Sequence, residues 1–151
     1  MVINIPGLDP VAKGRARVTK RGHAYTPKKT KLFEEAVRLS AIAQMRRGGH
    51  GIESGPISVH VALVFTPPKS WPKWKRAAAI AGDVKHTGKP DADNLAKGVC
   101  DALNGIAWVD DSQIVSLTVS KGYAAESGVF IGVDKVRGFC AGTVKAGDIR
   151  I

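Results

Sequence analysis

The sequence predicts one α/β domain of the α+β kind, in which a mixed sheet of about four or five strands packs against two or three helices. Some segments alternate apolar and polar residues with the period of a strand, and others repeat apolar residues with the period of a helix. The chain has 151 residues, which is enough for one domain with a real core and too few for two ordinary domains. Its hydrophobic content of 44% and charged content of 24% are typical of a soluble globular protein.

The first half of the chain predicts a strand, a helix and a second strand. Residues 2–5 form a short apolar strand. Thr26 and Pro27 begin a helix that runs to about Arg47, because a hydroxyl caps a helix and proline suits the first helical position. The residues expected on its buried side are Leu32, Phe33, Ala36, Val37, Leu39 and Ala43. Residues 56–66 alternate most clearly, so we expect them to form a central strand.

The second half begins with two predicted helices separated by a loop. Residues 70–81 form a capped helix, and residues 83–88 show no pattern and predict a mobile loop. The next helix begins at Asp93 or Asn94 and ends at Leu103, before an Asn-Gly pair.

Two further strands follow. Residues 113–123 alternate, and residues 128–133 form a partner strand. The residues of the first of these strands that we expect to point inward are Val115, Leu117 and Val119. Beyond residue 134 the pattern fades, so we expect a domain over residues 1–137 and a flexible C-terminal extension over residues 138–151.

Basic residues outnumber acidic ones, 23 to 13, which gives a net charge of +10 and predicts a polyanionic partner, most simply nucleic acid. Two segments, residues 13–31 and 69–76, concentrate this charge. Each is either a solvated face or a strip that binds the phosphate backbone. Trp71 and Trp74 in the second segment either pack in the core or stack on an unpaired base. The candidate DNA-binding residues are Lys13, Arg15, Arg17, Lys20, Arg21, Lys28, Lys29, Lys69, Lys73, Lys75, Arg76 and Lys89.

An acidic motif, Lys-Pro-Asp-Ala-Asp-Asn-Leu-Ala-Lys, contains Asp91, Asp93 and Lys97, and a second acidic pair, Asp110 and Asp111, follows it. Two carboxylates at one end of a helix and two more returned by a short turn can converge on a hard cation. Ligation by oxygen alone suits Mg²⁺ or Mn²⁺. Lys97 comes four residues after Asp93, so the two share a helix face.

The same acids also have a purely structural interpretation. An aspartate before a helix is usually a cap, and an Asp-Asp pair after an apolar run usually belongs to a turn. Four acids and a lysine within so basic a chain favour a metal site that faces a polyanion.

Two observations bear on the compartment. Cys100 and Cys140 lack the spacing of a zinc site, and we expect both to be free thiols in a reducing environment. The chain has no run of eighteen apolar residues and no signal peptide, so we expect a cytoplasmic protein with no membrane partner.

Taken together, the motifs resemble the RusA family of Holliday-junction resolvases, which are common in bacteria and their phages. The early signature is Lys-Gly-Arg-Ala-Arg at residues 13–17, where alanine replaces the proline of many members, with Tyr-Thr-Pro at residues 25–27. The core signature covers residues 89–97, 101–105 and 108–114, and the resemblance as a whole extends to about residue 133.

The resemblance implies a homodimeric nuclease of the bacterial host cytoplasm that makes paired nicks across a four-way DNA junction during recombination and repair. It implies a requirement for Mg²⁺, for which Mn²⁺ substitutes. The essential acids of the family would fall on Asp91, Asp93 and Asp111 and its essential lysine on Lys97, with Asp110 in support.

Other functions remain open at this stage. The chain is alternatively a non-catalytic module that binds branched DNA, in which the acids are caps and turn residues. It is also compatible with a nuclease that acts on flaps, replication forks or RNA. A phosphatase fits poorly, because a small substrate has no use for the basic segments.

Overall fold

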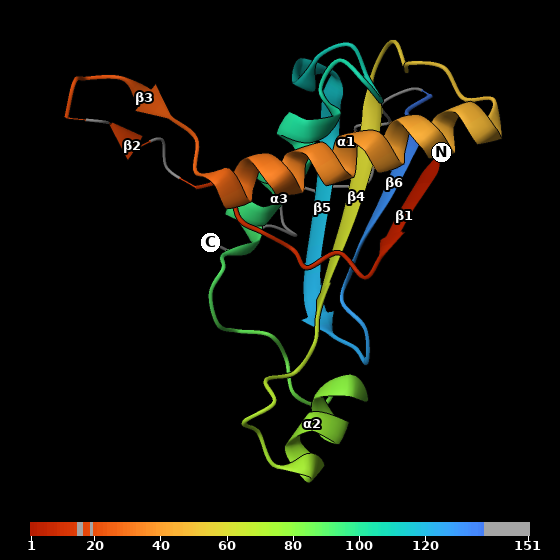
Figure 1. Ribbon diagram of the computed structural model, residues 1–151. Coiled ribbons are helices and arrows are strands. Elements are labelled where there is room, and N and C mark those ends of the chain that lie inside the picture. Colours follow the sequence, from red (N-terminus) through yellow and green to blue (C-terminus); the bar gives the residue numbers. More distant parts are fainter. Residues whose placement is uncertain (15–16, 19, 138–151) are drawn as a thin grey trace, which may run out of the picture.

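Four strands form a mixed sheet in the order β1-β6-β4-β5 in the computed structural model, which describes residues 1–14, 17–18 and 20–137 (Figure 1). The strands are β1 (Val2–Pro6), β6 (Gly128–Lys135), β4 (Ile57–Phe65) and β5 (Ile114–Tyr123). β6 pairs antiparallel with both β1 and β4, whereas β4 and β5 run parallel. The parallel pair requires a crossover, and the chain between β4 and β5 supplies it with two helices and the acidic motif.

Helices cover one face of this sheet. They are α1 (Lys28–Gly48) and α3 (Ala92–Leu103), whereas α2 (Lys73–Ile80) lies beyond the ends of β4 and β5 (Figure 1). A small hairpin of β2 (Arg17–Val18) and β3 (Ala24–Tyr25) projects near the start of α1 (Figure 1). This arrangement confirms the predicted fold class: one compact α+β domain with a four-stranded mixed sheet and three helices over the described residues.

The core lies between the sheet and the two covering helices. Alternate residues of β4 are buried, as its period of two predicts, and α3 buries one broad apolar face. The largest fully buried side chains are Trp108, Ile3, Ile57, Leu63, Leu95, Leu103, Ile131, Val37, Val59, Val61, Val99 and Val129. None of the helices in the described ranges is long and apolar enough to span a membrane.

Some predicted core positions are wrong. Leu32 and Leu39 of α1 are 61% and 57% exposed, because the buried stripe of this helix follows Phe33, Val37 and Ala41 instead. Two expected inward residues of β5 are also exposed, at 55% for Val115 and 46% for Leu117. β5 is an edge strand, and its register against β4 shifts between Ile57 and Ser58, so Val115 has no partner there.

Candidate active site

Asp91 and Asp93 lie at the N-terminal end of α3. Asp91 is the N-cap residue, with an extended backbone, and Asp93 lies in the first turn, so the helix begins earlier than the sequence predicts. The Asp91 side chain forms no capping hydrogen bond, and both carboxylates are exposed. Lys97 is also exposed, one turn after Asp93 on the same helix face. Among the described residues, none of these three side chains forms a hydrogen bond or an ion pair.

Asp110 and Asp111 differ from each other in their partners. Asp110 caps a short 3₁₀ turn, η1 (Asp111–Gln113): its Oδ2 accepts from the backbone N–H of Ser112 at 2.9 Å, and Gln113 Oε1 accepts from the backbone N–H of Asp110. These hydrogen bonds from Ser112 hold the pKa of the Asp110 carboxyl below its usual value. The capping role therefore accounts for the position of Asp110.

A buried residue of the core orients the side chain of Asp111. The indole Nε1 of Trp108, a fully buried residue, donates to Asp111 Oδ1 at 2.7 Å. A buried indole N–H needs an acceptor, so this bond both satisfies Trp108 and fixes the carboxylate. The other carboxylate oxygen, Oδ2, has no partner within the described chain.

The two acidic groups stay apart along α3. Asp111 lies near the C-terminal half of this helix, where burial, together with the charges of Asp111 and Asp101, raises the pKa of the Cys100 thiol to about 11. Asp93 precedes Cys100 by seven helical residues, which is roughly 10 Å along the axis at 1.5 Å per residue. Accordingly, no three His, Cys, Asp or Glu side chains in the described residues lie close enough to hold one ion. Within the part of the chain that the structure describes, no such group joins both acidic pairs, and their convergence on one ion stays a prediction.

The pair at the start of α3 nevertheless has the chemistry that a hard cation requires. Both donors are carboxylate oxygens that no other group occupies, and they lie at the positive end of a helix beside a lysine. Mg²⁺ is commonly held by one or two carboxylates together with water and substrate phosphate. The donor set of Asp91 and Asp93 fits such a site.

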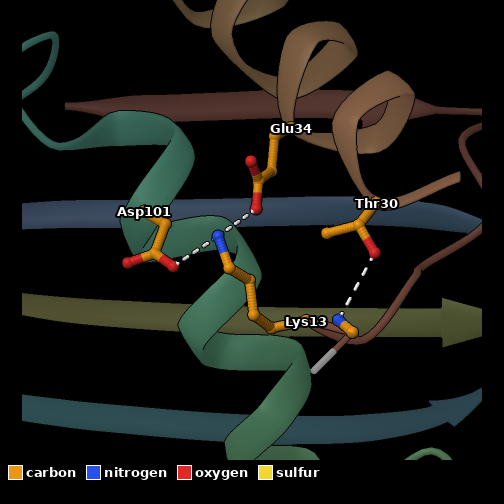
Figure 2. Close-up of polar contacts among 5 residues, drawn as sticks. Lys13, Thr30, Glu34 and Asp101 are labelled. Carbon is orange, nitrogen blue, oxygen red and sulfur yellow. Dashed lines mark hydrogen bonds and ion pairs between the residues drawn. The ribbon is translucent and has the colours of Figure 1, made fainter. Parts of the chain in front are cut away.

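Lys13 is the candidate DNA-binding residue whose surroundings differ most from expectation. Its Nζ lies 2.6 Å from Glu34 Oε1 of α1 and 2.8 Å from Asp101 Oδ2 of α3 (Figure 2). Partial burial opposes its charge, but the hydrogen bonds and charges of the two acids outweigh burial and raise the pKa of Lys13. The next residue, Gly14, donates its N–H to Thr30 Oγ1 at 3.3 Å (Figure 2).

The other candidates divide into three groups. Lys75 lies with its Nζ 4.0 Å from the centre of the Trp71 ring, as a cation–π pair. Arg15 lies outside the described residues, as does Cys140, and the side chain of Arg17 is not described. The exposed candidates are Lys20, Arg21, Lys28, Lys29, Lys69, Lys73, Arg76 and Lys89.

Sequence reasoning missed Lys121. Its Nζ donates to the carbonyl oxygen of Gly88 at 2.7 Å and to that of Pro90 at 2.9 Å, directly before Asp91. The available signal was its position: Lys121 follows Val119 with the period of the inward-facing residues of an apolar strand.

The loop before the acidic motif also differs from expectation. His86 is buried, and its ring packs against Phe65 and Tyr123, so the predicted loop is attached to the sheet at this residue. The sequence does not predict this contact. Residues 83–88 have no periodic pattern that would place His86 against the ends of β4 and β5.

Comparison with known proteins gives two matches. The family model described as Endodeoxyribonuclease RusA matches residues 7–134. The chain is 41% identical over 133 residues to "Uncharacterized protein YqaN" of Bacillus subtilis (strain 168), covering 85% of this chain and 92% of that protein. The family match extends over the basic segment, the acidic motif and the strands that frame them, in agreement with the resemblance of the motifs. The chain therefore belongs to the RusA family of endodeoxyribonucleases.

Proposed function

We propose that the protein is a divalent-metal-dependent endonuclease that resolves four-way DNA junctions by paired, symmetric nicks in recombination and repair. Membership of the RusA family supports a nuclease. The observation that carries the proposal is the start of α3, where two carboxylates and a lysine lie exposed without partners among the described residues, in a chain of net charge +10. Acids kept free in such a basic chain are expected to act on a polyanion.

Asp91 and Asp93 are the residues that would hold the metal, Mg²⁺ or in its place Mn²⁺. When bound, a divalent ion would polarise the phosphate and make a coordinated water more acidic. Lys97 places a positive charge one turn away, where it stabilises the charge that develops on phosphate or orients the attacking water. The positive end of α3 adds to this attraction for the phosphate.

The exposed basic residues would hold the arms of the junction. Those near the β2–β3 hairpin and those near α2 lie on different parts of the fold, which suits a branched substrate (Figure 1). Phosphate contacts of this kind carry affinity without reading sequence. We leave Lys13 out of this group, because Glu34 and Asp101 already neutralise its charge.

The proposal includes a homodimer. A four-way junction offers two equivalent strands to cut, and a two-fold dimer presents two equivalent sites. No group of three acids that could hold an ion is found in the described part of one chain, which supports a shared site. In this proposal, Asp111 of one copy completes the metal site formed by Asp91 and Asp93 of the other.

Replacement of Asp91 separates binding from chemistry. We expect Asp91→Asn to abolish cleavage of a four-way junction while junction affinity in the absence of metal changes less than about twofold, since phosphate contacts carry that affinity. Gel-shift and cleavage assays on one labelled junction measure both quantities. Asp83→Asn, which removes an exposed acid from the preceding loop, is the matched control and should cleave normally. Cleavage by Asp91→Asn at the wild-type rate would show that this assignment is wrong.

A further inference from the structure

Two contacts attach the segment just before Asp91 to the end of the sheet. His86 and Lys121 make these contacts, and neither residue has a role in the chemistry proposed above. This inference rests on the proposed function, because it concerns how the acidic pair is held in place.

The first contact is aromatic. Phe65 at the end of β4 and Tyr123 at the end of β5 are register partners in the parallel pair. The His86 ring lies on both of them, with centroid distances of 4.4 Å to Phe65 and 4.9 Å to Tyr123. Trp71, just before α2, meets Tyr123 edge-on at 5.5 Å. The ring of His86 is therefore packed where the sheet ends and α2 begins.

The second contact is polar and lies closer to Asp91. Val119 packs against the core, so alternation places Lys121 and Tyr123 on the same, helix-covered side of β5. Thr118 and Ser120 line a hollow on the opposite face. From this side the Lys121 ammonium reaches the carbonyl groups of Gly88 and Pro90. Charge-assisted hydrogen bonds are stronger than neutral ones, and two on one donor restrict the segment at two points.

The two contacts act on the segment in sequence. The chain meets the ends of β4 and β5 at His86, is bound by Lys121 at Gly88 and Pro90, and enters α3 at Asp91. A carboxylate must be held close to its productive position to act on a reacting group, and Asp91 has no side-chain partner of its own to hold it. Its position therefore depends on the backbone that precedes it.

We infer that Lys121 is a positioning residue for the catalytic acids, which fixes the backbone before Asp91 to the edge strand of the sheet while His86 holds the other end of the same segment.

The test uses the full-length protein with Lys121→Met, Lys121→Arg and a matched control, Lys85→Met. Lys85 is an exposed lysine of the same loop, so its replacement removes equal charge without removing the anchor. Three kinds of measurement are made on each protein: amide hydrogen exchange at Thr87 and Leu95, Mg²⁺ affinity by calorimetry, and junction cleavage, which gives kcat and KM.

We expect Lys121→Met to exchange at least about tenfold faster at Thr87 and Leu95, with α1 unchanged. The N–H groups of these residues donate to the carbonyls of Lys85 and Asp91, and loss of the Lys121 anchor lets the segment between them open. Mg²⁺ affinity should fall about tenfold and kcat by about tenfold to a hundredfold, with KM for the junction nearly constant. Lys121→Arg should recover most of each property, since a guanidinium group can donate to both carbonyls. Lys85→Met should resemble the wild type.

Two results would overturn the inference. Unchanged exchange in Lys121→Met would mean that the lysine does not hold the segment. Faster exchange with unchanged Mg²⁺ affinity and kcat would mean that the segment does not position the acids. Failure of the proposed function is distinguishable from both results. A wild-type protein that cuts no junction would contradict the nuclease proposal, whereas hydrogen exchange and Mg²⁺ affinity would still test whether Lys121 holds the segment.

Discussion

Lys13 exemplifies how one residue of a basic segment acquires a different role from its neighbours. Its side chain joins α1 to α3 through Glu34 and Asp101, and its backbone N–H donates to the carbonyl of Asn94 in the first turns of α3 at 2.9 Å. A Cβ at Gly98 would lie 3.6 Å from the Lys13 nitrogen, an ordinary contact distance, so this face of α3 packs directly against the backbone at Lys13. The base of the basic segment is thus attached directly to the helix that carries the acids.

This geometry predicts that Lys13 contributes to stability and not to phosphate binding. Lys13→Met should lower the free energy of unfolding by about 1–3 kcal/mol, since it removes two charge-assisted hydrogen bonds and leaves two carboxylates facing each other. The slope of log affinity for DNA against log salt should remain that of the wild type. Denaturant unfolding and salt-dependent binding assays measure the two effects.

Lys20→Met is the matched control for Lys13. Lys20 is exposed in the β2–β3 hairpin, so its loss should reduce the salt slope by about one and leave stability unchanged. If Lys13→Met reduced the slope and did not affect unfolding, Lys13 would be the phosphate contact that the sequence predicts.

Individual residues were predictable to different degrees. The acids at the start of α3 are visible in the sequence because capping and helical spacing are local properties. The pairing of Lys13 with Asp101 is not, because it joins segments 88 residues apart that only the packing of α3 on α1 brings together.

The segment between α2 and α3 is the element that most directly affects the site. Burial of the His86 ring lowers the pKa of His86, and the charge of nearby Lys121 adds to this shift. Phe65 and Tyr123, which pack against the ring, are aromatic and place no carboxylate beside it. Protonation of His86 would therefore introduce a charge into an environment that disfavours it.

A lowered folded-state pKa makes stability depend on pH in a definite direction. The unfolded chain binds a proton at His86 near pH 6.5, and the folded chain binds it only at lower pH, so His86 contributes fully above 6.5 and less as pH falls through that value. We expect the wild type to lose stability relative to His86→Phe as pH falls from 7.5 to 5.5. Urea unfolding of both proteins measures this difference. Curves that stay parallel over this range would contradict a buried, neutral His86.

The periodicity of the sequence predicted which helices and strands form better than it predicted where each one ends or which of its residues are buried. The period of two in β4 and the helical spacing of α3 are properties of the segments themselves, and both elements form as predicted. Exposure of Leu117 on β5 depends instead on that strand lying at the edge of the sheet, which is a property of topology.

The whole molecule carries a large positive charge. The described residues of one chain form no cluster of acids that could hold a metal ion. The net charge of +10 predicts affinity for DNA that falls steeply with salt. Because no group of three such ligands is found among the described residues of one chain, our proposal predicts that two chains share each site.

Mixing two inactive variants tests that sharing. If Asp91 of one chain acts with Asp111 of the other, Asp91→Asn and Asp111→Asn should each be inactive alone, and a refolded mixture should regain activity. A mixed dimer then contains one site with both wild-type residues. Mixtures of each variant with itself are the controls, and cleavage assays measure the result. A mixture as inactive as its components, with mixed dimers demonstrated, would place all the acids of a site in one chain.

The most direct test of the central claim is cleavage of a labelled synthetic four-way junction by the purified protein, with Mg²⁺ or with EDTA, beside a linear duplex of the same sequence. The proposal predicts symmetric nicks that require metal and occur preferentially on the junction. Binding to the junction without cleavage under any divalent metal would contradict it and would leave Asp91 and Asp93 with structural roles alone.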